Sequence, residues 1–368
     1  MPDEEHDVYR ALQQHLDALP VGFPRTKSGV DIAILKKLFT PEEARLASFL
    51  AFMPEPLKRI HKKVCKEMEI GIEVLESKLD EMLRKGLLNG GEDSTTGKKL
   101  YANAFLMMGM FDYQVKTLTK ELMADVDRYI AEAYIHEYKL SGTPQLRTIP
   151  IEQSVEKENP VATYEDVRHL IETRRPINVT ECICRKGKRL MGKTCERNAP
   201  SETCFQFGTV AHIYKQMGIG REISKEEAHR IIDEVEKAGL VIQPGNSIKP
   251  GNICCCCGDC CLIITHAKKL QRPLEVFATN HRSSINAEAC KGCGTCIKRC
   301  PMQAVYKGSN GKSTINDNLC IGCGVCVPAC PEHAMHLVKR DQDVVPPADQ
   351  MEMFMKIGAG KEKARTQK

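Results

Sequence analysis

Eight cysteines near the C-terminal end of the sequence occur in two copies of one pattern. Each copy reads Cys-x2-Cys-x2-Cys-x3-Cys-Pro. Two-residue spacers let one tight loop present three thiolates to three irons of a [4Fe-4S] cubane, so this spacing favours iron–sulfur chemistry. The first copy contains Cys290, Cys293, Cys296 and Cys300, and the second contains Cys320, Cys323, Cys326 and Cys330.

Two other uses of these eight thiols are weaker. Zinc sites usually pair cysteines across a longer spacer, and neither copy has that form. No signal peptide is recognisable, and no apolar run approaches the roughly 18 residues that a membrane-spanning helix needs. We therefore expect a cytoplasmic protein without a membrane span, and disulfides are rare in that reducing compartment.

The paired motif closely resembles bacterial two-cluster ferredoxins. The resemblance implies a small pseudo-twofold domain with two short hairpins and two short helices, and a role in electron transfer. In such proteins the cysteine before each proline ligates the other cluster. The implied ligands are Cys290, Cys293, Cys296 and Cys330 for cluster 1, and Cys320, Cys323, Cys326 and Cys300 for cluster 2.

Glycines and a turn signal fit the same domain. Gly292, Gly294, Gly322 and Gly324 lie between the cysteines, where loops around a cluster need close backbone approach and positive φ. Asn310-Gly311 is a typical hairpin turn.

A second population of ten cysteines lies between residues 160 and 280. Three of them repeat the two-residue spacing, and we expect a fourth thiolate from a remote cysteine. The remaining thiols would serve a second cubane, a larger cluster or a redox-active dithiol, and the sequence does not choose among these three. The sequence thus predicts at least one additional iron–sulfur cluster. The repeated tripod is Cys254, Cys257 and Cys260, the remote candidates are Cys182, Cys184, Cys195 and Cys204, and Cys256 and Cys261 are further candidates.

The main alternative in this middle region is zinc, on Cys182, Cys184, Cys195 and Cys204. Six basic residues between Arg185 and Arg197 have three possible roles. They would lower thiol pKa values and stabilise clusters, form a docking patch for an acidic partner, or remain solvated.

Local signals predict the elements that carry the middle cysteines. We expect a strand at 177–180, a helix over 201–218, and a helix that begins at Ser224 with a capping box and ends at Gly239. These elements predict a small α/β Cys-rich domain.

The N-terminal part is helical. Three helices followed by a Gly-rich two-stranded wing resemble a winged helix-turn-helix domain over residues 28–110. Thr40 and Glu43 form a capping-box pattern before the helix that Pro41 begins. Between Glu69 and Lys85 the expected third helix has more acids than bases, which disfavours nucleic acid as its partner, since phosphate binding needs basic residues.

The predicted fold is an α+β multidomain chain with a winged-helix-like N-terminal domain, a small α/β Cys-rich middle domain and a C-terminal ferredoxin-like 2[4Fe-4S] domain. This layout, with "CICRKGKRLMGKTC" and the Cys-dense run, resembles a family of poorly characterised iron–sulfur proteins of anaerobic bacteria. The expected boundaries are an N-terminal arm at 1–27, the winged-helix-like domain at 28–110, a connecting helix and linker at 111–159, the middle domain at 160–280, the ferredoxin domain at 281–340 and a flexible tail at 341–368.

Three functions fit these features. A net charge of +5 over 368 residues does not demand a nucleic-acid partner. The radical S-adenosylmethionine spacing C-x3-C-x2-C does not occur, and no G-x-G-x-x-G follows a strand. We therefore expect an electron carrier or oxidoreductase subunit that serves redox partner proteins. The alternatives are a redox-sensing DNA-binding regulator and a redox enzyme with an open cluster site in the middle domain.

Overall fold

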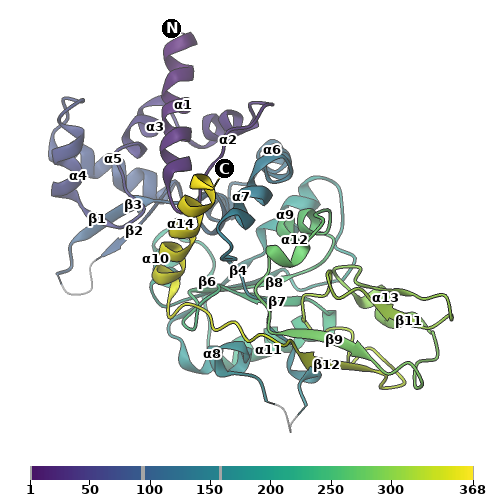
Figure 1. Ribbon diagram of the computed structural model, residues 1–368. Helices are drawn as coiled ribbons and strands as arrows, with labels where there is room; N and C mark the ends of the chain where they lie inside the picture. Colours follow the sequence, from purple (N-terminus) through teal and green to yellow (C-terminus); the bar gives the residue numbers. More distant parts are fainter. Residues whose placement is uncertain (1, 93–95, 157–159, 368) are drawn as a thin grey trace.

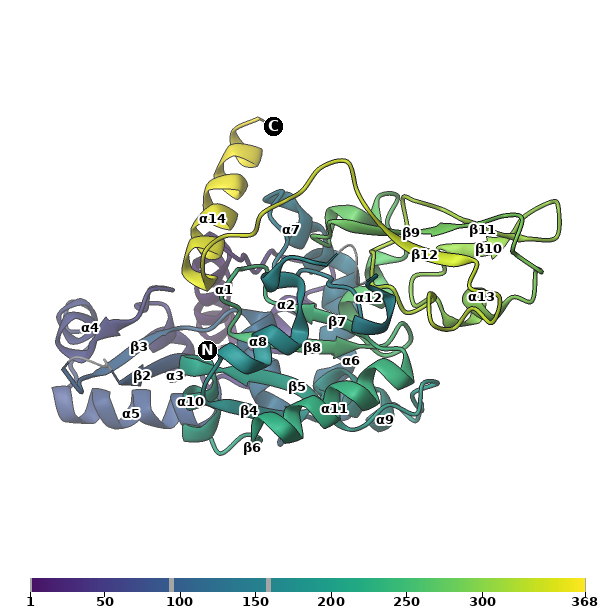
Figure 2. The same ribbon diagram turned by 90° about the horizontal axis from the view of Figure 1, so that it is seen from below.

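The computed structural model describes residues 2–92, 96–156 and 160–367. It is a mixed helix-and-sheet structure in which helices and a small sheet at the N-terminal end adjoin a central five-stranded sheet (Figure 1). The strand pairs of the C-terminal domain lie on the side of that central sheet away from the N-terminal sheet (Figure 2). Throughout these described ranges, no helix has both the length and the apolar composition needed to cross a bilayer.

Five helices and a three-stranded sheet form the N-terminal region. The helices are α1 (Pro2–Ala18), α2 (Val30–Leu38), α3 (Pro41–Ala47), α4 (Leu57–Val64) and α5 (Ile72–Arg84). The antiparallel strands, in spatial order, are β1 (Glu55–Pro56), β3 (Lys99–Asn103) and β2 (Leu88–Glu92). The Thr40 side chain accepts from Glu43 N, and the Glu43 carboxylate accepts from Thr40 N at 2.8 Å, which confirms the predicted capping box. The winged-helix assignment itself stays a prediction, and residues 93–95 of the expected wing lie outside the described residues.

Within the N-terminal arm predicted at 1–27, α1 is a docked helix. Tyr9, Leu12 and Leu16 of α1 are buried, and α1 packs against α3 and α2. The Tyr9 hydroxyl donates to Phe39 O at 2.8 Å. The apolar spacing of this helix thus produces a packed face rather than a loose segment.

The connecting helix expected after residue 111 is not one continuous helix. It follows the short π-helical turn η1 (Leu106–Met110) and is divided into η2 (Asp112–Val115), α6 (Lys120–Tyr129), the π-helical segment η3 (Ile130–Tyr134) and α7 (Ile135–Leu140). The break before α6 has a local cause, because the Thr119 side chain accepts a hydrogen bond from Leu122 N at 3.1 Å and begins a new helix there.

The central sheet holds the middle-region cysteines. Its five antiparallel strands, in spatial order, are β6 (Arg221–Glu222), β4 (Ile177–Glu181), β5 (Glu202–Phe207), β8 (Asn252–Cys256) and β7 (Val241–Pro244). The surrounding helices are α8 (Val167–Thr173), α9 (Ile183–Leu190), α10 (Gly208–Gln216), α11 (Lys225–Ala238) and α12 (Leu262–Ala267), with short turns η4 (Glu152–Ser154), η5 (Thr163–Glu165) and η6 (Pro273–Glu275). The strand expected at 177–180 is confirmed, whereas the helix expected over 201–218 is strand β5 followed by α10. Buried Thr203, Phe205 and Phe207 alternate along β5, and such β-branched and aromatic residues favour a strand.

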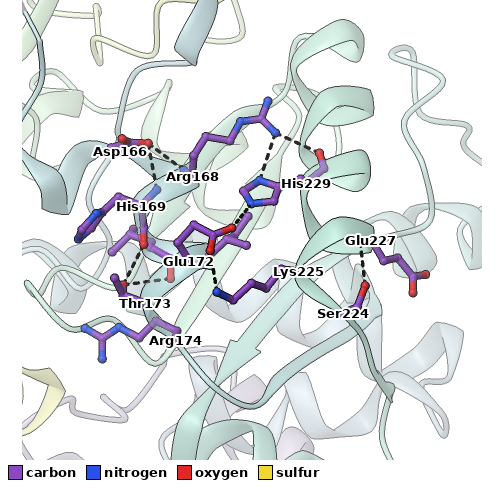
Figure 3. Close-up of polar contacts among 12 residues, drawn as sticks. Asp166, Arg168, His169, Glu172, Thr173, Arg174, Ser224, Lys225, Glu227 and His229 are labelled. Atoms are coloured by element: carbon purple, nitrogen blue, oxygen red, sulfur yellow. Dashed lines mark hydrogen bonds and ion pairs between the residues drawn. The ribbon is translucent and has the colours of Figure 1, made fainter.

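Helices α8 and α11 pack together through contacts between polar side chains (Figure 3). Glu172 accepts from Lys225 Nζ at 2.6 Å and lies 2.8 Å from His229 Nε2. The Ser224 hydroxyl accepts from Glu227 N at 3.2 Å, and Gly239 ends the helix with a φ of 71°. Both ends of the predicted helix are therefore confirmed. Only the Ser224 half of the predicted capping box forms, because the Glu227 carboxylate accepts from Arg221 instead.

The C-terminal domain contains two antiparallel strand pairs, of which one is a hairpin. Strand β9 (His281–Ile285) pairs with β12 (Met335–Lys339), and β10 (Val305–Lys307) pairs with β11 (Ser313–Ile315). Gly311 has a φ of 77°, and Gly308 N donates to Lys312 O at 2.7 Å, which confirms the predicted turn. Of the two short helices that the resemblance implies, α13 (Thr295–Arg299) is present, while residues 325–329 form turns. Pro328 lies in that second segment and lacks the N–H that a helix needs.

The flexible tail predicted at 341–368 is wrong, because α14 (Gln350–Thr366) is a docked helix. Met353, Ile357 and Lys361 recur every four residues and are all buried. Lys361 Nζ donates to Asp17 O at 2.6 Å and lies 2.7 Å from Glu137 Oε1. The C-terminal helix therefore closes against the end of α1 and against α7 (Figure 1).

Replacing Lys361 by Met is expected to destabilise this docking. Glu137 is only 7% exposed at its side chain, so it would remain as a buried charge without its cation. Breaking such a pair costs about 3–5 kcal/mol. We expect a lower thermal midpoint and faster proteolytic removal of α14. Lys363→Met, at an exposed position of the same helix, is the matched control; equal proteolysis of the two variants would contradict this account.

Candidate iron–sulfur and metal centres

The two ferredoxin-type cysteine loops depend on glycine. Gly292, Gly294, Gly322 and Gly324 have φ values of 70°, 77°, 67° and 72°. A Cβ atom at Gly292 would overlap Gly311 O, and one at Gly322 would overlap His281 O. The predicted need for glycine is confirmed, because positive φ and close backbone approach occur together here.

The surroundings of the cysteines repeat across the two halves of the domain. Ser283 Oγ lies 3.2 Å from Cys326 Sγ, and Ser313 Oγ lies 3.2 Å from Cys296 Sγ. In the same way, Ala304 N donates to Cys300 Sγ at 3.2 Å and Ala334 N donates to Cys330 Sγ at 3.3 Å. Strands β9 and β11 thus each supply a serine to a cysteine of the opposite loop, and the two backbone N–H groups serve the cysteine of their own motif. Such hydrogen bonds stabilise negative charge on sulfur.

The two loops differ in exposure. Cys293 is exposed, and a hydrogen bond from the Thr295 side chain holds its pKa below the usual value. Cys323 is buried, and burial followed by the charges of Cys326 and Cys300 raises its pKa well above the usual value. Burial also raises the pKa of Cys326 to about 12. The loop of Cys290 therefore faces solvent, while the loop of Cys320 faces the body of the protein.

The middle region contains a compact four-donor group. The sulfur atoms of Cys195, Cys257 and Cys260 and a carboxylate oxygen of Asp259 all lie within 4.8 Å of one another. Cys195 Sγ and Cys257 Sγ are 3.7 Å apart, and Cys260 Sγ is 3.3 Å from Asp259 Oδ2. A hydrogen bond from Cys260 lowers the pKa of Cys257 to about 6, which favours the thiolate that metals bind.

These separations fit a single ion. A tetrahedral metal with metal–sulfur bonds of about 2.3 Å holds its sulfur ligands roughly 3.8 Å apart. A cubane binds each thiolate to a different iron and so needs a wider arrangement. The donor set of three thiols and one carboxylate suits zinc or a single iron.

Six other thiols form a continuous chain beside this group. Hydrogen bonds from Cys204 and Cys256 hold the pKa of Cys254 well below its usual range. Hydrogen bonds from Cys184 and Cys256 lower the pKa of Cys261 to about 5. The chain of neighbours runs Cys204, Cys254, Cys256, Cys261, Cys184 and Cys182.

This thiol chain lines an enclosed cavity of about 70 Å³. Its surroundings favour negative charge, since Arg185 is 3% exposed and donates to Cys255 O at 3.1 Å. Burial opposes the charge of Arg185, but the nearby thiols of Cys182 and Cys257 outweigh it and raise its pKa above the usual value. Of the roles predicted for the basic residues, Arg185 fits the lowering of thiol pKa values, because its charge adds to the hydrogen bonds from Cys204 and Cys256 that lower the pKa of Cys254.

The four-donor group adjoins the ferredoxin domain. A Cβ atom at Gly258 would lie 2.8 Å from Pro301 Cα, so the two backbones touch directly after Cys300. Arg197 donates to Lys298 O and Arg299 O, both at 3.0 Å. The middle cysteines and the buried side of the ferredoxin domain are therefore contiguous.

The structure groups the middle cysteines differently from the sequence prediction. Cys254 lies on β8 with Cys204 and Cys256, so it does not join Cys257 and Cys260 in the four-donor group. The set predicted for zinc is also divided, because Cys195 joins Cys257 while Cys204 joins Cys254. Side chains alternate along a strand, which is why β8 separates cysteines that a loop would bring together.

Two carboxylates at these centres were not predicted from the sequence. Asp259 stands between Cys257 and Cys260 in the sequence, and that position is the signal that could have identified it. Asp112 lies near Cys254 and accepts from Met108 N at 2.7 Å; burial and the charge of Cys254 raise its pKa to about 7. No sequence pattern links Asp112 to the cysteines, since their contact depends on tertiary structure.

Comparison with known proteins bears on the C-terminal domain. Residues 289–335 match the family model described as a 4Fe-4S dicluster domain. No curated protein and no solved structure matches the chain. The wider family resemblance and the winged-helix assignment therefore stay predictions. The C-terminal domain is of the ferredoxin type, with the 4Fe-4S dicluster pattern that its paired cysteine motifs predict.

Proposed function

We propose that this protein is an iron–sulfur electron-transfer protein that relays single electrons between redox partner proteins. Two [4Fe-4S] clusters in the C-terminal domain would carry the first steps. The match of residues 289–335 to a 4Fe-4S dicluster domain supports this proposal. The proposed ligands are Cys290, Cys293, Cys296 and Cys330 for cluster 1, and Cys320, Cys323, Cys326 and Cys300 for cluster 2.

Two observations support the crossed assignment. The charges of Cys300 and Cys320 both act on Cys323 and Cys326, so Cys300 lies near the second loop. The donors also suit thiolate ligands, because Ala304 N and Ser283 Oγ point hydrogen bonds at sulfur atoms of this set.

Serine-to-alanine changes should lower the reduction potential of one cluster at a time. Ser283→Ala removes the hydroxyl near Cys326 and should affect cluster 2, while Ser313→Ala removes the one near Cys296 and should affect cluster 1. A lost hydrogen bond of about 1 kcal/mol corresponds to a decrease of roughly 40 mV for one electron. EPR-monitored redox titration measures both potentials. The two variants serve as controls for each other, and a shift of the same cluster in both would contradict the assignment.

In the middle region we propose two centres. The six-thiol chain around the enclosed cavity would hold a further iron–sulfur cluster, with Arg185 balancing its negative charge. Cys195, Cys257, Cys260 and Asp259 would hold one zinc or iron ion, as their spacing favours.

The proposed relay runs from the exposed loop of Cys293 to the buried loop of Cys323 and then to the middle cluster. The observation that carries this order is the backbone contact between Gly258 and Pro301, because Pro301 follows Cys300, the proposed remote ligand of cluster 2, and the contact places that ligand beside the middle cysteines. Partner proteins would dock at the solvent-facing loop.

Stopped-flow reduction under anaerobic conditions tests the relay. A small reduced ferredoxin-type donor should reduce the middle cluster at least tenfold more slowly in Cys323→Ser than in the wild type. Cys65→Ser, at an exposed cysteine on the end of α4, is the control and should behave like the wild type. Unchanged reduction of the middle cluster in Cys323→Ser would remove the relay.

A further inference from the structure

A second, larger cavity lies between the N-terminal sheet and the central sheet. Its volume is about 260 Å³, and β2, β3, α10, α14 and the ends of β5 and β8 form its walls. Its lining is mainly apolar and rich in rings: Phe52, Phe105, Tyr113, Tyr214 and Phe354. The cavity is outside the ferredoxin domain and is used by none of the centres described above.

The inner end of this cavity meets the thiol chain. Cys204, Cys254, Asp112 and Met108 line both the open cavity and the enclosed one beside it. A molecule in the open cavity would therefore lie against two cysteines of the proposed middle cluster.

The charge of the lining limits the ligand. Among the described residues that line the cavity, Asp112 and Glu92 are acidic and none is Lys, Arg or His. An anion would meet two acidic side chains and no cationic one, and its desolvation would cost several kcal/mol. An uncharged molecule with an apolar body fits this lining.

The backbone beside the cavity is strained. Met108 has a φ of 54°, and its N–H donates to Asp112 Oδ2. Non-glycine residues rarely adopt positive φ, and such strain is concentrated at ligand sites, where the surrounding structure maintains it. The strained segment fixes the Asp112 carboxyl at the inner end of the cavity, where it can hydrogen-bond a polar group on a ligand.

The volume sets the size of the ligand. An engineered cavity of roughly 150 Å³ holds benzene, and ordinary ligand sites begin near 300 Å³. We propose that this cavity binds an uncharged organic molecule with one or two rings, whose polar edge faces Asp112 and the thiols of Cys204 and Cys254. This inference goes beyond electron transfer between proteins and supplies the relay with a small-molecule partner. The binding itself does not require the relay.

Equilibrium dialysis of the full-length, cluster-loaded protein under anaerobic conditions tests the proposal. The probes are 2-naphthamide and 2-naphthoate, which share two rings and differ in charge. We expect 2-naphthamide to bind at least tenfold more tightly. Ile213→Trp and Val210→Phe, which add bulk to the cavity wall, should each weaken it at least tenfold.

Met355→Trp is the matched control, because Met355 is 57% exposed on α14 and does not line the cavity. It should bind 2-naphthamide like the wild type. Iron content and thermal midpoint identify any variant that fails to fold, and the charge preference of the wild-type protein tests the proposal without a variant. Absence of 2-naphthamide binding, equal or tighter binding of 2-naphthoate, or full affinity in both bulky variants would overturn the proposal. Such a result would leave the relay intact, whereas failure of the relay would leave this binding unchanged.

Discussion

Replacing Cys323 by Ser is expected to remove about four irons and the EPR signal of one reduced cluster, while the other ferredoxin cluster remains. The large effect follows from burial. Cys323 is only 8% exposed, so no thiol from solution can reach the cluster to replace the lost ligand. Cys293→Ser should remove the other cluster. Iron and sulfide analysis with EPR of the reduced protein measures both losses.

The exchange of the last cysteine between the two motifs, Cys300 to cluster 2 and Cys330 to cluster 1, gives a more specific prediction. Cys300→Ser should alter the same EPR signal as Cys323→Ser, although Cys300 belongs to the first motif in the sequence. Cys330→Ser should alter the same signal as Cys293→Ser. Cys65→Ser controls for the loss of a thiol as such. If Cys300→Ser and Cys293→Ser affected one cluster and Cys330→Ser and Cys323→Ser the other, the assignment would be wrong.

Cysteine changes in the middle region should have two distinct effects. Cys257→Ser should remove one metal ion and leave the iron–sulfur clusters, because it breaks the four-donor group. Cys256→Ser should instead remove about four irons, since Cys256 joins Cys254 to Cys261 in the thiol chain. Metal analysis of the purified variants distinguishes the two effects.

Cys65→Ser is the matched control for both variants. Cys65 is exposed at the end of α4, and it lines neither the cavity of the thiol chain nor the four-donor group. It should keep all metals. Loss of the same metals from Cys257→Ser and Cys256→Ser would show that the middle region holds one centre rather than two.

The sequence allowed the ferredoxin domain to be predicted because its signals are local. The conformation of the loop with three closely spaced cysteines depends on Gly292 and Gly294, which lie within the loop itself. The turn at Gly311 likewise depends only on residues next to it. The caps at Thr40 and Ser224 are local in the same sense. Such features depend on neighbouring residues and do not require knowledge of the rest of the fold.

The grouping of the middle cysteines could not be predicted in this way. The same two-residue spacing describes a loop at Cys290 and a strand followed by a turn at Cys254. Strand β8 turns Cys254 toward Cys204, its register partner on β5, and the turn after it directs Cys257 toward Cys195. Strand pairing decides the ligand sets, and pairing is a property of the whole sheet.

The docked C-terminal helix illustrates a third case. The residues after Gln350 are rich in charge, which is typical of a solvated tail. Met353 and Ile357 are nevertheless buried against apolar residues that lie far away in the sequence. Lys361 donates hydrogen bonds to two backbone carbonyl oxygens at the end of α1. Acidic residues of α5 likewise pair with a cation from another element, since Lys99 on β3 binds both Glu76 and Asp80.

The most direct test of the central proposal is the analysis of iron, sulfide and zinc in anaerobically purified protein, combined with EPR after reduction. Two ferredoxin clusters and one middle cluster predict about 12 irons with matching sulfide, one further zinc or iron ion, and EPR signals from three reduced clusters. About eight irons with no third EPR signal would contradict a middle cluster and would end the relay at the ferredoxin domain.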